Sequence, residues 1–406
     1  MIRLKGKKVL HVMLMLFCMA IVLTLSQGAE AKIFKVNSTE DMVDATPGDA
    51  VCMTATGVCT LRAAIQEANA LPGADEIRLK AGTYRLLLIG EGEDFAATGD
   101  LDIKNSVTIV GKSAALTVVD GHHSDRVFQV FGTATVATFV GLKIQNGVIA
   151  TGGFAGGGIA NIGATVIVNN CTITNNISYA MIGGGILSQA GNLKVVSSRV
   201  TQNELYYEGG QTIGGGIASY LDTSLKIIGT IVADNFVSNV TDTTGSNDIA
   251  LGGGIAILAT DTVKIRSCKI LGNIADSWTT DLYASSGAGL FMTAVPNANI
   301  INTKIANNTA TGFDSFGGGV CAISSNATFS GCTITENSAL AREDGAGGGM
   351  YLEKGTDPMT ITINNLCSVT SNHASFGGGL YLNGAVALNI SADSVVANNL
   401  QDNIFP

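Results

Sequence analysis

The sequence predicts an all-β protein whose mature part is a single right-handed parallel β-helix. Three observations predict this fold. A glycine triplet followed by an asparagine recurs at intervals of 27 to 38 residues, which indicates one structural unit per repeat. Apolar β-branched residues with two-residue spacing precede each asparagine, as in strands. No helical pattern separates the repeats, so the strands must follow one another in a coil rather than in β-α-β units.

The first 31 residues have the pattern of a signal peptide. Basic residues occupy 3–8, an apolar run covers 9–25, and Ala29-Glu30-Ala31 supplies a small-x-small cleavage site. We therefore expect export and cleavage after residue 31. An uncleaved membrane anchor is the alternative, because the apolar run is slightly long.

The composition limits the partners of the mature chain. Removal of residues 1–31 takes away four basic residues and one acidic residue, which leaves 19 basic and 31 acidic residues and a net charge of −12. Such a field repels nucleic acid and anionic membranes. The mature chain has no second apolar run of spanning length, so we expect a monomer that does not cross a membrane.

Residues 32–74 form a predicted cap that precedes the coils. The stretch 60–71 is expected to be an amphipathic helix, because Leu61, Ile65, Ala68 and Leu71 share one face. Thr60 can cap its start, and Pro72-Gly73 ends it. A solenoid needs such a cap because its end exposes core and strand edges.

Residues 75–406 carry the repeats, whose equivalent positions form columns. Glycine triplets begin at residues 156, 183, 214, 252, 317, 347 and 377, with a degenerate GAGL at 287. The asparagines that follow them are Asn176, Asn203, Asn235, Asn273, Asn308, Asn337, Asn372 and Asn399. Five positions before each asparagine stands a small residue: Cys171, Ser198, Thr230, Cys268, Thr303, Cys332, Cys367 or Ser394.

Stacked coils explain these columns. Glycine is expected where the chain turns through positive φ or where coils crowd. Asparagine is expected to take the left-handed conformation and to form an amide ladder between coils. In the last two repeats the apolar pair slips by one position, to Ile361/Ile363 and Leu388/Ile390, which predicts a one-residue insertion or bulge.

The cysteines divide into two groups. Cys52 and Cys59 are close in sequence within an exported chain, so we expect a disulfide between them. The other five mature cysteines are expected to be free thiols, because side chains in adjacent parallel coils point the same way.

Two parts of the chain resemble known families. The segment VCMTATGVCTLRAAIQEANALPGADEIRL resembles the CSLREA domain of exported bacterial proteins, with Cys-Thr-Leu-Arg-Ala-Ala at 59–64 in place of Cys-Ser-Leu-Arg-Glu-Ala. Thr60 and Ala63 depart from that pattern. The GGGI and x-x-N repeats are similar to the repeats of polymorphic outer-membrane proteins and, more loosely, to the pectin-lyase-like fold. The resemblance implies export and a β-helix, and it implies no established chemistry.

The candidate chemical sites are few. Glu91, Glu93, Asp94, Asp100 and Asp102 form an acidic segment that could hold calcium, and a solvated loop is the simpler interpretation. His122, His123 and Asp125 are a second candidate, against an exposed turn between coils. Tyr206, Tyr207, Trp278 and Tyr283 lie in loop-like stretches that could bind sugars or proteins, or could pack on the solenoid.

These observations predict an exported cell-surface or extracellular scaffold, associated with the outer membrane or secreted. We expect it to bind a glycan or a protein ligand, as an adhesin does, without catalysis and without a cofactor other than possible calcium. The alternative is a polysaccharide lyase or glycoside hydrolase that acts on acidic polysaccharide. The sequence contains no G-x-S-x-G nucleophile motif, no H-E-x-x-H or CxxC motif of a zinc site, and no phosphate-binding P-loop.

Overall fold

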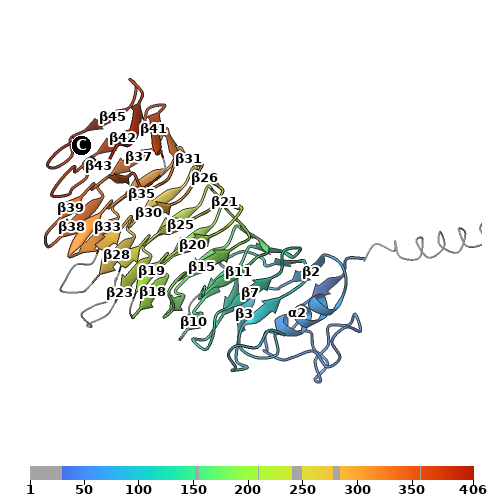
Figure 1. Ribbon diagram of the computed structural model, residues 1–406. Helices are drawn as coiled ribbons and strands as arrows, with labels where there is room; N and C mark the ends of the chain where they lie inside the picture. Colours follow the sequence, from blue (N-terminus) through green and yellow to red (C-terminus); the bar gives the residue numbers. More distant parts are fainter. Residues whose placement is uncertain (1–29, 151–154, 209, 240–248, 278–283, 357) are drawn as a thin grey trace, which may run out of the picture.

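The structure, a computed structural model, describes residues 30–406 except 151–154, 209, 240–248, 278–283 and 357. Short strands follow one another around a coil, and the coils stack into a rod (Figure 1). Described strands on neighbouring coils pair in parallel, for example β12 with β16 and β16 with β21. The predicted parallel β-helix of about ten coils is therefore confirmed. The signal-peptide prediction concerns residues 1–31, nearly all of which lie outside the described residues.

Sheets A, B and C form the main body of the rod. Sheet A contains β1 (Ile33–Lys35), β2 (Asp75–Arg78), β5 (Val107–Val110), β8 (Val136–Val140), β12 (Thr165–Asn169), β16 (Asn192–Val196), β21 (Ser224–Ile228), β26 (Thr262–Arg266), β31 (Ala298–Ile301), β36 (Ala327–Ser330), β41 (Thr360–Asn364) and β44 (Ala387–Ile390). Sheet B contains β3 (Gly82–Arg85), β6 (Thr117–Asp120), β9 (Lys143–Gln145), β13 (Thr172–Thr174), β17 (Arg199–Thr201), β22 (Ile231–Ala233), β27 (Lys269–Leu271), β32 (Lys304–Ala306), β37 (Thr333–Thr335), β42 (Ser368–Thr370) and β45 (Val395–Ala397). Sheet C contains β4 (Leu101–Ile103), β7 (Phe128–Phe131), β11 (Ile159–Ile162), β15 (Ile186–Gln189), β20 (Ile217–Tyr220), β25 (Ile255–Leu258), β30 (Leu290–Thr293), β35 (Val320–Ile323), β40 (Met350–Glu353), β43 (Leu380–Asn383) and β46 (Ile404–Phe405).

Sheets D and E form a wing beside the main body. Sheet D contains β10 (Val148–Ile149), β14 (Ile177–Ser178), β18 (Glu204–Tyr207), β23 (Phe236–Asn239), β28 (Ile274–Ser277), β33 (Thr309–Gly312) and β38 (Ser338–Ala341). Sheet E contains β19 (Gln211–Ile213), β24 (Ile249–Leu251), β29 (Ala284–Ser286), β34 (Asp314–Phe316) and β39 (Gly345–Ala346). A full coil thus runs through sheets A, B, D, E and C. The sequence pattern predicted only the strands of sheets A and B, because the wing strands are less regularly apolar.

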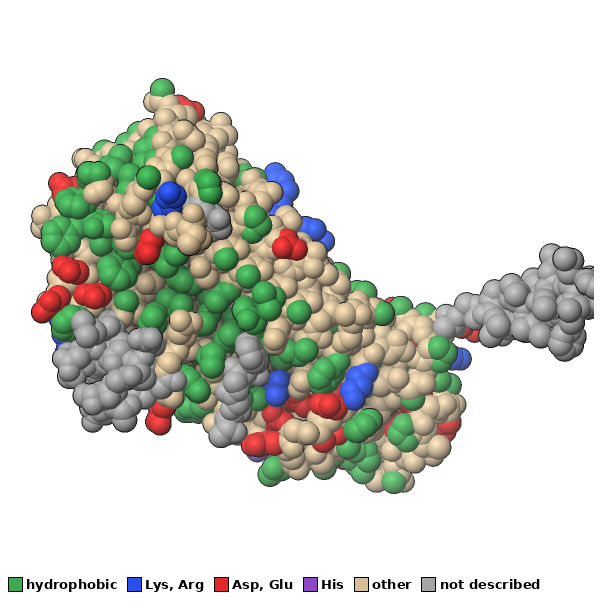
Figure 2. Space-filling view, in the orientation of Figure 1, with side chains coloured by type: hydrophobic (Ala, Val, Ile, Leu, Met, Phe, Trp, Pro, Cys, Tyr) green, Lys and Arg blue, Asp and Glu red, His purple; other side chains and the backbone are tan. Residues whose placement is uncertain are grey.

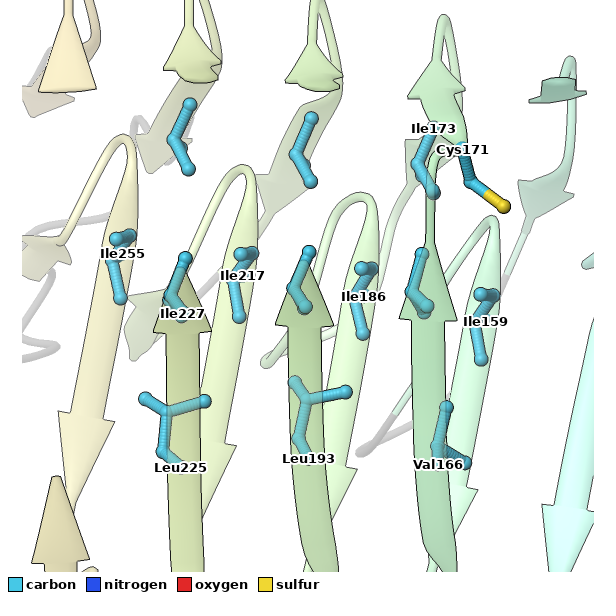
Figure 3. Packing of buried hydrophobic residues seen from close by; sticks show 14 of the residues in the cluster. Ile159, Val166, Cys171, Ile173, Ile186, Leu193, Ile217, Leu225, Ile227 and Ile255 are labelled. Atoms are coloured by element: carbon cyan, nitrogen blue, oxygen red, sulfur yellow. The ribbon is translucent and has the colours of Figure 1, made fainter. Parts of the chain in front are cut away.

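The core consists of columns of aliphatic side chains inside the main body. Figure 3 shows Ile159, Ile186, Ile217 and Ile255 of sheet C stacked in one row beside a row from sheet A. These side chains are fully buried. Buried residues alternate with more exposed ones along the strands of sheet A, as the two-residue spacing predicts, whereas the strands of sheet C bury three consecutive residues. Burial of such columns supplies the main stabilisation of a solenoid, because each coil covers its neighbours.

The N-terminal cap is built around helix α2 (Leu61–Ala70). The Thr60 side chain accepts a hydrogen bond from the Ala63 N–H, which caps the helix as expected. The disulfide between Cys52 and Cys59 is present at the entry to this helix. The cap contains more than the predicted helix. Its strand β1 pairs with β2 and so adds a strand to sheet A before residue 75.

The irregular repeat near the C-terminus has a local explanation. Ile361 and Ile363 of β41 remain in register with Ala327 and Phe329 of β36. The extra residue lies instead in the bend between sheets A and B, where residues 365 and 366 both have positive φ. Equivalent bends, such as that at Asn302, contain one residue of this kind. The expected insertion is therefore in the corner, and the strand itself is not bulged.

Candidate functional site

The asparagine column fixes where sheet D begins. Asn203 Nδ2 donates to Asn235 Oδ1 at 3.0 Å, and Asn235 Nδ2 donates to Asn273 Oδ1 at 2.9 Å. Each Oδ1 also accepts the backbone N–H of the preceding asparagine, as at Asn203 and Asn235. The same pattern joins Asn176, Asn203, Asn235, Asn273, Asn308, Asn337, Asn372 and Asn399. Since β18 starts directly after Asn203, this ladder sets the register of the wing strands.

One expectation about these asparagines was wrong. The ladder asparagines are not in the left-handed conformation. The residue before each of them has positive φ instead, for example Gln202 at 56° and Asp234 at 56°. The left-handed corner turns the chain, and the asparagine after it points into the stack, where its amide reaches both neighbouring coils.

The glycine triplets lie against the ladder, which explains why the two motifs occur together. A Cβ on Gly254 would lie 2.7 Å from the Gly289 carbonyl oxygen and 2.9 Å from Cγ of Asn273. The first glycine of a triplet has a different role, since Gly252 has a φ of 66°. Glycine therefore serves both to turn the chain and to make room for the asparagine column.

An aromatic cleft of about 580 Å³ lies on the wing, beside β14 and β18. Its described lining residues are Ala150, Tyr179, Glu204, Tyr206, Tyr207 and Glu208. The rings of Tyr179 and Tyr206 stack, with centroids 5.8 Å apart and planes inclined by 24°. Phe236 lies behind them, 5.6 Å from Tyr206. The cleft thus offers flat apolar faces beside carboxylates, an arrangement suited to ligands with both apolar and hydroxyl surfaces.

Tyr206 is held in one orientation and one protonation state. Its hydroxyl donates to Glu204 Oε2 at 2.9 Å. Burial, followed by the neighbouring Glu204, raises the pKa of the Tyr206 hydroxyl above its usual range. The phenol therefore stays neutral, so it can serve as a ring platform and a hydrogen-bonding group, and it is not suited to be a general base near neutral pH.

Two of the four aromatic residues that the sequence offers as candidate ligand-binding residues lie in this cleft, and ligand binding by them stays a prediction. Tyr206 and Tyr207 were expected to bind ligand, and both line it. Tyr179, Glu204 and Glu208 were not predicted. The signal for Tyr179 was available, because it lies three residues after Asn176 as Tyr206 lies three residues after Asn203. Trp278 and Tyr283 lie outside the described residues.

The acidic segment is organised around backbone groups of its own loop. Glu93 accepts hydrogen bonds from the N–H groups of residues 95, 97 and 98. Asp102 Oδ2 accepts the Ala96 N–H, while its Oδ1 has no hydrogen-bond partner. Asp100 Oδ2 lies 2.9 Å from Arg126 Nε, without hydrogen-bond alignment. Glu91 and Asp94 lie in the same loop.

Two of these carboxyl groups are poorly solvated. Burial, followed by the nearby Asp102 carboxylate, raises the pKa of Asp100 to about 8. Burial, reinforced by Glu93 against a hydrogen bond from the Ala96 N–H, raises the pKa of Asp102 to about 7. No group of three or more His, Cys, Asp or Glu side chains within the described residues is arranged to hold a metal ion. Calcium binding by this segment remains a prediction.

Arg62, a residue that the sequence analysis did not single out, holds this loop against the cap. Its guanidinium is fully buried and pairs with Asp41, with Nε 2.6 Å from Oδ1. It also donates to the carbonyls of residues 96, 98, 99 and 100. A single arginine on an amphipathic helix gives no sequence signal of such a role, because its partners lie 21 to 38 residues away in the chain.

The remaining predicted residues lie apart from the cleft. His122 and His123 are exposed in the turn between β6 and β7, both with positive φ, and Asp125 beside them is buried. Asp125 accepts backbone N–H groups from Asp100 and Arg126. The free cysteines of the described chain are all buried: Cys171, Cys268, Cys321, Cys332 and Cys367.

Fold and cleft together define a right-handed parallel β-helix with an aromatic cleft on its wing. The family profile described as "Right handed beta helix region" matches residues 241–401, in agreement with this fold. Comparison with curated proteins gave no match, and comparison with solved structures gave none. Within the described chain, the helices fall short of the length and apolar character required to cross a bilayer.

Proposed function

We propose that this protein is an exported binding scaffold that holds a glycan in the aromatic cleft on sheet D. The stacked rings of Tyr179 and Tyr206 beside Glu204 are the observation that carries the proposal. Apolar faces of sugar rings pack on aromatic rings, and carboxylates accept hydrogen bonds from sugar hydroxyls. Protein ligands use the same residue types, so absence of binding to every glycan in the test below would favour a protein ligand instead.

Three features support export. The N-terminal signal pattern predicts it, and the resemblance to the CSLREA domain implies it. The Cys52–Cys59 disulfide is typical of proteins in oxidising compartments. A surface or extracellular location gives an elongated scaffold access to polysaccharides, and the wing presents its cleft on the side of the rod.

The alternative of a polysaccharide lyase or hydrolase has one observation in its favour. Glu204 and Glu208 line the same cleft, and paired carboxylates are the usual machinery of glycoside hydrolysis. Glu204, however, already accepts a hydrogen bond from the neutral Tyr206 hydroxyl. We therefore favour binding without turnover.

The decisive experiment combines a glycan array with an activity screen of the mature protein. We expect saturable binding to a subset of glycans and no release of reducing or unsaturated ends. Tyr179→Ala and Tyr206→Ala should each lower the affinity at least about fivefold, since aromatic contacts of this kind contribute about 1–3 kcal/mol.

Tyr381→Ala is the matched control, because Tyr381 also lies in an aromatic stack, at the C-terminal end of sheet C. It should leave glycan binding unchanged. Robust chain cleavage that is lost in Glu204→Gln would establish the enzymatic alternative instead. Binding that is indifferent to both cleft tyrosines would exclude this site.

A further inference from the structure

The outer face of sheet A carries a column of positive charge in the middle of the rod. Lys194, Lys226 and Lys264 occupy equivalent positions of β16, β21 and β26 and pair in register. Successive coils are about 4.8 Å apart, so the three lysine side chains form one row along the axis of the rod. Lys194 and Lys226 are exposed, and Lys264 is partly exposed.

The charge continues around the bend onto sheet B. Arg266 ends β26 just before the bend, and Lys269 begins β27 just after it. Lys269 pairs in register with Lys304 of β32, and Arg199 lies in the same column two coils earlier. We call the seven residues the basic stripe: Lys194, Arg199, Lys226, Lys264, Arg266, Lys269 and Lys304.

The strands that carry the stripe supply no compensating negative charge. The strands of sheets A and B from β12 to β42 contain no Asp or Glu. None of the seven cations forms an ion pair with another described residue. Of the ten Lys and Arg residues between positions 127 and 406, seven lie in the stripe. Figure 2 shows Lys and Arg side chains projecting from the right-hand edge of the rod, near the position of β21 and β26 in Figure 1.

Sheet stability does not explain this arrangement. Like charges directly opposite one another on neighbouring strands destabilise a sheet. The neighbouring coils show that uncharged residues fit the same column, because Asn299 and Thr328 follow Lys264 in register. A bound polyanion would offset the repulsion between the stacked lysines.

We propose that the basic stripe binds a linear acidic polysaccharide along the axis of the rod. A slender chain can lie within a Debye length, about 8 Å at physiological ionic strength, of the stripe alone. A planar membrane or a nucleic-acid duplex would also meet the acidic remainder of a chain with net charge −12. An extended sugar chain that carries one charge per residue or per disaccharide also repeats on a scale comparable to the coil spacing.

This surface is separate from the aromatic cleft. The stripe lies on the outer faces of sheets A and B, whereas the cleft lies on sheet D beyond the asparagine ladder. Binding at the stripe therefore does not depend on the proposed function of the cleft. The two can be tested with different variants of the same mature protein.

The probe is fluorescently labelled heparin oligosaccharide, measured by anisotropy with the full mature chain over a series of NaCl concentrations. The test variant is K194Q/K226Q/K264Q. The control variant is K35Q/K80Q/K112Q, which removes the same charge from exposed lysines outside the stripe.

We expect the test variant to bind at least about tenfold more weakly at low salt and the control to bind like the wild type. The slope of log affinity against log salt should fall by about two for three lost contacts. K194Q/K226Q/K264Q should bind the glycan that is held in the cleft as tightly as the wild type does, which distinguishes a failure of the stripe from a failure of the proposed function of the cleft.

Three results would overturn the proposal. The first is equal loss of affinity in the test and control variants, which would indicate a response to net charge. The second is absence of heparin binding by the wild type at low salt. The third is tighter binding of oligo-dT or of phosphatidylglycerol vesicles than of heparin, which would assign the stripe to another class of partner.

Discussion

Replacement of Asn273 by alanine is the sharpest test of the ladder. Asn273 is fully buried in the middle of the rod. Its Oδ1 accepts hydrogen bonds from both the backbone N–H and Nδ2 of Asn235. Its Nδ2 donates to Asn308 Oδ1 and to the Val232 carbonyl. Alanine would remove all four hydrogen bonds and leave the partner groups buried.

The expected loss of stability follows from the polar groups that lose a hydrogen-bond partner in Asn273→Ala. The Asn235 N–H loses its acceptor and the Val232 carbonyl loses this side-chain donor, whereas Asn308 Oδ1 still accepts the backbone N–H of residue 273. Each buried polar group left unsatisfied costs about 1–3 kcal/mol. With the Asn235 N–H left unsatisfied and the three other hydrogen bonds lost at about 0.5–1.5 kcal/mol each, we expect the free energy of unfolding to fall by about 3–6 kcal/mol.

The assay is equilibrium unfolding in urea followed by circular dichroism. Asn299→Ala is the control, because Asn299 lies on the outer face of β31 and makes one exposed hydrogen bond, to Asn297. The control should change stability by less than about 0.5 kcal/mol. Asn399→Ala, in the partly exposed last coil, should lie between the two. An Asn273→Ala protein as stable as the Asn299→Ala control would refute the account of the ladder.

Three further predictions concern the N-terminal cap and the acidic segment that packs on it. The pKa values of Asp100 and Asp102 are raised to about 8 and about 7 in the folded state, so the stability that their protonated forms contribute should be complete below about pH 4 and lost as pH rises toward 8. The melting temperature should therefore decline between pH 5 and 9 in the wild type but not in the double Asp→Asn variant. An identical decline in both proteins would contradict this prediction. Arg62→Met should destabilise the cap by about 3–5 kcal/mol, because it leaves a buried acidic partner unpaired, and protease cutting within residues 86–100 would report the loss. Replacing Cys52 and Cys59 by serine should cost about 2–3 kcal/mol, and mass spectrometry of the alkylated, non-reduced wild type should find both unmodified.

The repeat architecture was predictable because stacking imposes the same demand on every coil. A column such as Ile159, Ile186, Ile217 and Ile255 is readable in one sequence, since each coil repeats the observation. The glycine and asparagine columns were readable for the same reason. The close contact between the glycine column and the asparagine column could not be predicted from the sequence, because it depends on the distance between residues such as Gly254 and Asn273 in space.

The wing and the cap were harder to predict for physical reasons. Wing strands such as β23 and β28 bury small residues, Val237 and Ala275, which give a weak periodic signal. The cap depends on unique long-range contacts, such as that of Arg62 with Asp41, which no repeat reinforces. The conformation of the ladder asparagines was mispredicted because Asn is common in left-handed corners, and Asn175 does occupy one directly before Asn176.

The aromatic cleft shows that alignment of the repeats can identify side chains that are neighbours on the surface. Tyr206 was selected because of its residue type, while its partner Tyr179 follows only once Asn176 and Asn203 are aligned. Alignment of every repeat on its asparagine therefore predicts which side chains lie next to one another on sheet D. The same alignment places Lys194, Lys226 and Lys264 in one column.

Hydroxyl-radical footprinting with mass spectrometry can locate a glycan on the aromatic cleft, because the extent of oxidation reports the solvent access of individual tyrosine rings. The mature protein would be oxidised with and without the glycan that binds most tightly on the array. The account predicts protection of Tyr179, Tyr206 and Tyr207 at saturating glycan, with Tyr381 unchanged. Unchanged oxidation of the three cleft tyrosines at saturation would contradict it.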